Sequence, residues 1–312
     1  MFAFFSKKKS TSTVGVQLTP RGICCVVIDH PDSGVPIVQG YRRYPVEKGK
    51  LSPKVITSLQ SYIADNQLEQ ANSCIVLDDK DYQLFVIEAP NVPKEEMSEA
   101  VKWKVKDLIL YPLSEAVVDV FLQPDDGDTH KLIANVLVTQ KTLVDERIQM
   151  AQSLGLNVVA VDVPELAYRN YFEVSEYSDK KIALISIKKS YGKLTVISGA
   201  EVYFSRSFPV DYKGGLLDDI PESDIVLEVQ RSLDYYERQL KQSVPSTIIY
   251  IGENIASDKV TNETKDNLNQ KVIVEENIHL ALTDDIDEMT SSVDMIATCG
   301  AALRQHMVTA AL

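Results

Sequence analysis

The 312-residue sequence has few of the residues that build metal centres or disulfide frameworks. It holds four cysteines, Cys24, Cys25, Cys74 and Cys299, and no two of them stand at CxxC spacing. Its four histidines are isolated, and none has a second ligand at helical or turn spacing. The sequence therefore predicts no metal site, and it predicts cysteines that are buried as free thiols in a reducing compartment.

Basic residues and long apolar runs are also scarce. The chain has 32 Lys and Arg against 45 Asp and Glu, a formal net charge of −13, and no basic stripe along any expected helix. Binding to nucleic acid requires clustered Lys and Arg, so no nucleic-acid partner is expected. No run of 18 apolar residues occurs, and the sequence predicts no membrane-spanning helix. A hydrophobic content of 45% is ordinary for a globular protein, and the length predicts about two domains.

The N-terminus combines aromatic and basic residues. Three phenylalanines of "MFAFFSKKKS" precede three lysines, an order opposite to that of a secretory signal. One interpretation is a flexible segment over residues 1–13. The other is a weak contact with anionic lipid, made by Phe2, Phe4, Phe5 and the lysines at positions 7 to 9 and worth about 1 kcal/mol per Lys.

Two strand–turn–strand stretches predict a duplicated α/β body. "VGVQLTPRGICCVVI" (14–28) and "IALISIKKSYGKLTVIS" (182–198) each contain two β-rich runs around a polar turn. Later segments predict a long helix over 224–243, a strand over 246–253, and a C-terminal helix over 293–307 with a small-residue kink or a close approach at Gly300.

The block from 82 to 161 predicts an inserted subdomain. Its order is strand, helix, strand, strand, helix, strand, which is that of a ferredoxin-like βαββαβ unit with a turn at 125–128. The first helix should bury Met97, Val101, Val105 and Leu108, and the second should begin at a Thr142 cap and end at Gly155. We expect a first lobe over 14–81 and 162–178, the insert over 82–161, and a second lobe over 179–312.

Three stretches carry a resemblance to a known family. "AVKWKVKDLILYPLSEAVVDV" (100–120), "GLNVVAVDVPELAYRNYF" (155–172) and "VQRSLDYYERQ" (229–239) are similar to their counterparts in the PilM family, the actin-like cytoplasmic proteins of type IV pilus assembly. Within that family the sequence is most similar to the MshI group, which serves mannose-sensitive haemagglutinin (MSHA) pili. The resemblance covers nearly the whole chain and implies an actin-like, ribonuclease H-like duplicated, bilobal fold with the inserted subdomain.

The family holds ATP between its lobes, and here the corresponding residues differ. The first phosphate loop of the family reads roughly G-I-D-I-G-S-x-x-I-K, and the second reads D-I-G. The resemblance places Gln17 at the first aspartate, Thr19 at the first loop glycine and Cys24 at the lysine. It places Ser186 and Lys188 in the second loop. The glycine cluster that usually contacts the adenosine is reduced to Gly252.

These replacements predict that ATP and Mg²⁺ are not cofactors and that the protein is not an enzyme. Magnesium prefers charged oxygen ligands, which the aspartates would supply. Glycine lets backbone N–H groups approach a phosphate closely, and a Cβ obstructs that approach. The opposing interpretation is that Lys188, Lys189 and Arg21 supply charge to a phosphate directly, as lysine does in other proteins.

The resemblance implies a non-catalytic assembly platform, located in the cytoplasm and peripheral to the inner membrane. Its expected partner is the cytoplasmic tail of a PilN-like bitopic membrane protein, seated in a groove between the first lobe and the insert. Trp103, Tyr111, Pro112 and Leu113 are the candidate peptide-binding residues, because tryptophan is favoured at binding hot spots. Trp103 could instead pack its helix onto the insert's own sheet.

Two other functions stay open at this point. One is a working ATPase whose lobe closure regulates pilus assembly. The other is a sugar or small-molecule kinase of the same superfold, for which no catalytic aspartate in a glycine-rich context is found.

Overall fold

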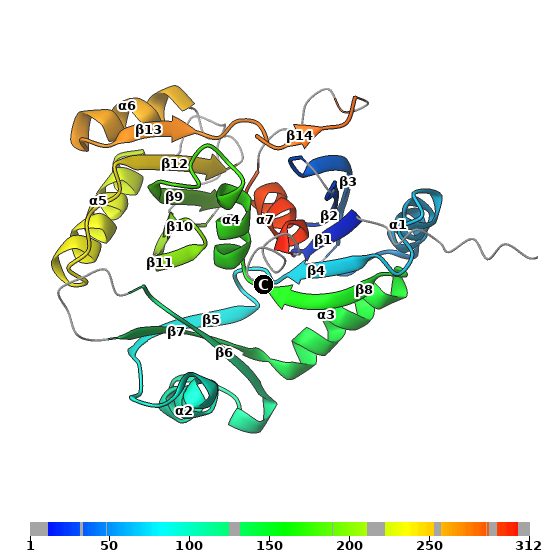
Figure 1. Ribbon diagram of the computed structural model, residues 1–312, viewed down its shortest axis with the longest axis horizontal. Coiled ribbons are helices and arrows are strands. Elements are labelled where there is room, and N and C mark those ends of the chain that lie inside the picture. The colour runs from blue at the N-terminus through cyan, green and yellow to red at the C-terminus, as the bar shows by residue number, and fades with distance from the viewer. Residues whose placement is uncertain are drawn as a thin grey trace, which may run out of the picture.

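The computed structural model describes residues 12–31, 34–47, 49–124, 132–188, 190–210, 222–252, 257–284, 286 and 292–304. The N-terminal Phe and Lys residues, the 125–128 turn and Lys189 lie outside these ranges. Two sheet-based lobes lie side by side, and a smaller subdomain is attached to them (Figure 1). No helix in the described ranges is long and apolar enough to cross a membrane.

The first lobe is built on a six-stranded sheet. Its strand order is β14-β3-β2-β1-β4-β8. The strands are β1 (Ser12–Leu18), β2 (Gly22–Asp29), β3 (Ile37–Pro45), β4 (Asn72–Val76), β8 (Asn157–Asp162) and β14 (Ala281–Leu282). Helix α1 (Pro53–Asp65), capped by the Ser52 side chain, buries Leu59 and Ile63 against one face of this sheet.

The second lobe repeats the same plan. Its sheet order is β11-β10-β9-β12-β13, which matches β3-β2-β1-β4-β8 strand by strand. The strands are β9 (Lys181–Lys188), β10 (Tyr191–Ser198), β11 (Glu201–Pro209), β12 (Thr247–Gly252) and β13 (Lys271–Val274), with helices α5 (Glu222–Arg238) and α6 (Ser257–Asn267). Each lobe therefore opens with an antiparallel hairpin whose first strand pairs in parallel with the fourth. The expected duplication is confirmed.

The inserted block has the predicted element order, but its last strand joins a different sheet. The elements are β5 (Tyr82–Glu88), α2 (Met97–Val105), β6 (Ala116–Leu122), β7 (Ile133–Gln140), α3 (Lys141–Ser153) and β8. The insert's sheet holds only β5-β7-β6, because β8 pairs in parallel with β4 of the first lobe. Helix α3 and β8 correspond to α6 and β13 of the second lobe. The 82–161 boundary is therefore too wide at its C-terminal end.

The end of the chain returns to the first lobe. Strand β14 pairs with β3, and helix α7 (Val293–Ala302) packs on β1, β2 and β4. The prediction that 179–312 forms the second lobe is therefore wrong for 281–302. Helix α4 (Pro164–Glu173) packs against α7 and against the second-lobe strands β10 and β11, so these two helices connect the lobes (Figure 1).

The α4–α7 contact requires the glycine at position 300. A Cβ on Gly300 would lie 1.8 Å from the carbonyl oxygen of Ala167. The predicted close approach is thus confirmed. The large core cluster around this contact joins residues of both lobes, among them Cys24 and Val76 of the first and Leu184 of the second.

The buried residues of α2 and the two ends of α3 differ in part from the sequence predictions. Helix α2 buries Met97, Val101 and Val105 as expected, but Leu108 is 49% exposed. The chain tightens into a 3-10 turn at Lys106–Leu108, which turns Ile109 inward in its place. Helix α3 begins at Lys141, so Gln140 precedes it and the predicted Thr142 cap lies inside the helix; it ends at Ser153, two residues before Gly155, whose φ is +96°.

Candidate functional site

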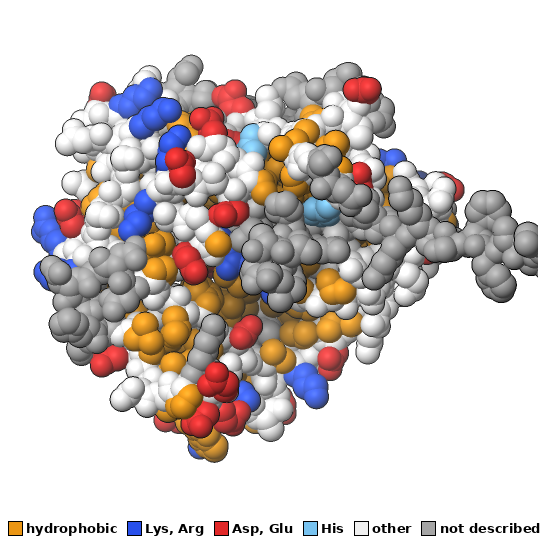
Figure 2. All heavy atoms as spheres, in the orientation of Figure 1, with side chains coloured by type: hydrophobic (Ala, Val, Ile, Leu, Met, Phe, Trp, Pro, Cys, Tyr) orange, Lys and Arg blue, Asp and Glu red, His pale blue; other side chains and the backbone are white. Residues whose placement is uncertain are grey.

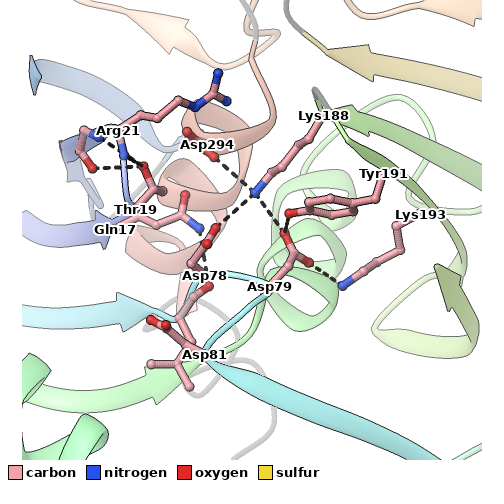
Figure 3. A network of polar contacts seen from close by, with 12 residues as sticks. Gln17, Thr19, Arg21, Asp78, Asp79, Asp81, Lys188, Tyr191, Lys193 and Asp294 are labelled. Carbon is pink, nitrogen blue, oxygen red and sulfur yellow. Dashed lines mark hydrogen bonds and ion pairs between the residues drawn. The ribbon is translucent and has the colours of Figure 1, made fainter. Parts of the chain in front are cut away.

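The candidate site lies between the lobes, where the turns of the two hairpins approach the ends of β4 and α7. Figure 3 shows Gln17, Thr19 and Arg21 of the first hairpin facing Lys188, Tyr191 and Lys193 of the second. Gln17, Thr19 and Lys188 are among the positions at which the resemblance places phosphate loops.

The first turn uses its own side chain to bind its backbone. The Thr19 hydroxyl accepts hydrogen bonds from the N–H groups of Arg21, at 3.3 Å, and Gly22, at 3.1 Å. The Thr19 N–H donates to the Gly22 carbonyl oxygen at 2.8 Å. The amides that a glycine-rich loop would offer to a phosphate are therefore occupied within the turn.

Gln17 replaces a carboxylate with a neutral amide. It is 1% exposed at the end of β1, and its Nε2 donates to the Leu77 carbonyl oxygen at 3.4 Å. Its Oε1 has no hydrogen-bond partner among the described residues. The first hairpin contributes no carboxylate here that could orient a magnesium ion.

Lys188 of the second turn binds three carboxylates of the first lobe. Its Nζ lies 2.8 Å from Asp79, 3.4 Å from Asp78 and 3.4 Å from Asp294 (Figure 3). Asp78 and Asp79 follow β4 and Asp294 lies in α7, so each of these ion pairs crosses from one lobe to the other. The four side chains are between 7% and 14% exposed.

Lys193, in strand β10 of the same hairpin, also contacts residues outside the second lobe. Its Nζ binds Asp79, donates to the Tyr82 hydroxyl at 2.8 Å, and pairs with Glu165 at 2.7 Å. The Tyr82 hydroxyl donates to Glu165 at 2.6 Å, and the Tyr191 hydroxyl donates to Asp79 at 2.8 Å. The buried Ser186 lies directly opposite Lys193 in the β9–β10 pairing.

We call this group the interlobe cluster; its charged members are Asp78, Asp79, Glu165, Lys188, Lys193 and Asp294. Burial alone raises the pKa of Asp79, but the neighbouring Lys193 and Lys188 hold it well below its usual range. Burial alone lowers the pKa of both lysines, but the carboxylates around them raise it above its usual value. Burial raises the pKa of Asp78. Both lysines are therefore charged at neutral pH, and carboxylates outnumber them.

The lysines of this cluster are not free to contact a phosphate without breaking their ion pairs. The two lysines already bind carboxylates, and the excess negative charge of the cluster repels a polyanion. No group of three or more His, Cys, Asp or Glu side chains in the described ranges has a geometry that could hold a metal ion. Gly252 ends β12 opposite Ile187, and residues 253–256 lie outside the described ranges.

The predicted peptide-binding residues lie on the outer side of the insert. Trp103 is 64% exposed on α2, with the Lys106 ammonium 5.8 Å from its ring centre, so it does not pack onto the insert's sheet. Tyr111 and Leu113 are partly buried against the insert's own core, and Pro112 is exposed. Helix α2 covers the face of the sheet that points away from the lobes (Figure 1). The role of these four residues in binding stays a prediction.

The opposite face of the insert's sheet carries apolar residues that the sequence analysis did not select. Val86 pairs with Asn135 and Val117 pairs with Thr139, so both valines point away from α2. They are 43% and 37% exposed, and Val159 on the neighbouring lobe strand β8 is 56% exposed. Figure 2 shows apolar side chains in the hollow between the insert and the lobes.

Comparisons with known proteins support the fold. No family profile and no curated sequence matches the chain. The chain is similar to a structure described as a PilM-PilN type IV pilus biogenesis complex, with a TM-score of 0.67 at 18% identity, covering 95% of this chain and 99% of the other. It is also similar to the cytoplasmic domain of EpsL, an inner-membrane component of the type II secretion system of Vibrio cholerae, with a TM-score of 0.52 at 11% identity, covering 96% and 95%.

A protein of unknown function from Bacteroides thetaiotaomicron with an actin-like ATPase fold gives a TM-score of 0.52 at 13% identity, covering 96% of this chain and 98% of that one. These likenesses extend over the whole chain, insert included. The predicted actin-like bilobal fold is confirmed.

Proposed function

We propose that the protein is a nucleotide-independent assembly platform that binds the cytoplasmic tail of a PilN-like bitopic inner-membrane protein. The observation that carries this proposal is the interlobe cluster, in which the protein's own lysines and carboxylates take the place of phosphate-binding loops. The full-length likeness to a pilus protein and to a secretion protein supports the assembly role. The resemblance of 100–120 and 155–172 favours an MSHA-type, MshI-like pilus machine.

The face of the insert's sheet opposite α2, which we call its inner face, is the surface that suits an extended peptide. Strand β8 is an edge strand of the first-lobe sheet, and its pairing with β4 skips Val159 at a bulge. An edge strand offers unpaired main-chain groups, and exposed apolar side chains beside it supply anchors. Val86 and Val117 are exposed on the face of the insert's sheet opposite α2. The proposed groove is therefore formed by β8 and the inner face of β5 and β6.

Two matched variants separate this groove from the surface predicted around Trp103. The probe is a synthetic peptide of the cytoplasmic tail of the bitopic membrane protein encoded beside this chain, measured by fluorescence anisotropy. Val159→Lys should weaken binding at least about tenfold, and Trp103→Ala should leave it unchanged. Loss only in Trp103→Ala would move the site to α2. Absence of binding by the wild-type protein would overturn the proposal.

Nucleotide independence is tested with the same protein. Isothermal titration with Mg-ATP should show weak binding or none, and the tail peptide should bind equally with and without it. Micromolar binding with steady phosphate release would favour the alternative function, an active ATPase whose lobe closure regulates assembly.

The N-terminal segment gives a separate proposal about location. We propose that Phe2, Phe4, Phe5 and the following lysines contact anionic lipid and keep the protein peripheral to the inner membrane. Deleting residues 1–10 should reduce co-sedimentation with anionic liposomes and leave the melting temperature unchanged. Equal sedimentation of the truncated protein would leave only the interpretation as a flexible segment.

A further inference from the structure

The charges of the interlobe cluster are distributed unevenly between the two lobes. Lys188 and Lys193 stand on the second-lobe hairpin, whereas Asp78 and Asp79 follow β4 and Asp294 lies in α7 of the first lobe. Three donors of this one hairpin, including the Tyr191 hydroxyl, meet on the single carboxylate of Asp79.

From this arrangement we propose that the ammonium group of Lys188 is a built-in cation that holds the two lobes closed without any bound ligand. The inference does not depend on the proposed binding of a membrane-protein tail. It concerns the conformation of the isolated chain.

The surroundings of the ammonium group support this role. Its three carboxylate neighbours come from two separate elements of the first lobe, so Lys188 joins them to each other as well as to the second lobe. An ammonium group donates three hydrogen bonds, and two of its carboxylate contacts have hydrogen-bond geometry. The position is nearly closed to solvent, since the Lys188 side chain is only 11% exposed. Salt therefore screens these pairs much less than it screens surface charges.

Removing the ammonium group would remove most of the attraction between the lobes and leave its first-lobe partners, Asp78, Asp79 and Asp294, with uncompensated negative charge. The remaining ammonium group of the interlobe cluster, that of Lys193, contacts Asp79 and is shared with Glu165. Loss of one partner of a buried ion pair leaves uncompensated buried charge, which is far more costly than replacing the whole pair. Separation of the lobes would expose these first-lobe carboxylates to water, which hydrates their charge.

The experiment measures the distance between the lobes. Cysteines introduced at Val35 of the first lobe and Leu227 of α5, both exposed, carry a donor and an acceptor dye for single-molecule energy transfer. The four native cysteines are buried and do not compete for the dyes. The wild-type protein should give one narrow distance that Mg-ATP does not change. Lys188→Ala should give a longer or broader distribution, which millimolar methylammonium shifts back toward that of the wild type.

Matched variants show whether a change in the interlobe distance comes from loss of the Lys188 charge or from general damage to the fold. Lys181→Ala, on the same strand with its ammonium over the Tyr203 ring, should leave the distance unchanged. If Lys188→Ala cannot be isolated folded, the melting temperatures of two milder variants decide. Lys188→Arg should stay close to wild type, and Lys188→Gln should melt roughly 5–15 °C lower.

An unchanged distance in folded Lys188→Ala, or equal melting temperatures for the Arg and Gln variants, would overturn the proposal. So would an opened Lys188→Ala protein that methylammonium leaves open.

Discussion

Replacing Gly300 with alanine tests the contact between helices α4 and α7 most directly. The new Cβ would lie 1.8 Å from the Ala167 carbonyl oxygen and 2.5 Å from its carbon, whereas real Cβ contacts essentially never fall below 3.0 Å. The obstacle is helix backbone, which no rotamer change can remove. The helices must therefore separate by more than about 1 Å, in a core that is packed as densely as an organic crystal.

Two opposing terms set the size of the effect. Alanine favours a helix interior over glycine by about 1 kcal/mol. Overpacking a buried contact costs roughly 1–3 kcal/mol and occasionally more, and backbone obstruction places Gly300→Ala at or above the upper end. We therefore expect a net loss of about 2 kcal/mol in the free energy of unfolding, which corresponds to a melting temperature roughly 5 °C lower.

Urea unfolding followed by circular dichroism measures this loss as a lower midpoint at unchanged slope. Gly22→Ala is the control, because its Cβ would meet the Tyr44 carbonyl oxygen at 3.2 Å and a small shift can relieve the contact. A Gly300→Ala protein as stable as wild type, or more stable, would show that helix propensity dominates and would refute the reasoning.

Three further predictions concern thiols, pH and the first turn. Burial raises the pKa of Cys24 and Cys25 to about 12, and all four cysteine side chains are buried. We therefore expect the four thiols to react with a disulfide reagent only after unfolding, and rapid reaction of the native protein would contradict this. The pKa of Asp79 is lowered in the folded protein, so its contribution to stability is present above the unfolded pKa near 3.8 and is lost as the pH falls. The pKa of Lys188 is raised in the folded protein, so its contribution to stability is present below pH 10.5 and is lost as the pH rises. Urea midpoints should thus be highest between about pH 5 and 9, and Lys188→Met should flatten the alkaline decline. Thr19→Gly frees two turn amides yet should not create Mg-ATP binding in a calorimetric titration, because the lysines stay paired; a clear gain of affinity would show that the turn alone prevents binding.

Local patterns in the sequence predicted most elements of the fold. The alternation in 14–28 and 182–198 specified both hairpins, because strands buried on one or both faces leave a clear apolar pattern. The partner of β8 could not be found in this way. A short apolar strand pairs with whichever sheet its connections bring near, and nothing in "NVVAVD" distinguishes the insert's sheet from that of the first lobe. The return of α7 to the first lobe is likewise a contact between distant parts of the chain.

Only part of the interlobe cluster was predicted, although the sequence contained further indications of it. The sequence pattern singles out Lys188 as a degenerate loop residue, but Lys193 lies within the buried stretch of strand β10 and is 5% exposed. Lysine is almost never buried unless it is paired, so its position indicated an acidic partner elsewhere. Asp78 and Asp79 directly follow a buried strand and were candidates for that partner. Which carboxylate meets which lysine depends on how the lobes pack, and no local pattern encodes that.

The return of the C-terminal helix has a consequence for synthesis on the ribosome. Helix α7 covers β1, β2 and β4, and the Thr13 hydroxyl in β1 donates to the carbonyl oxygen of Ala302 at 2.5 Å. Strands β1, β2 and β4 are therefore synthesised more than 200 residues before the helix that covers one face of their sheet. Until α7 emerges, that face stays open to chaperones or to neighbouring nascent chains. A chain interrupted between residues 274 and 293 would contain all the second-lobe strands β9 to β13 but would lack the helix that covers the first-lobe sheet.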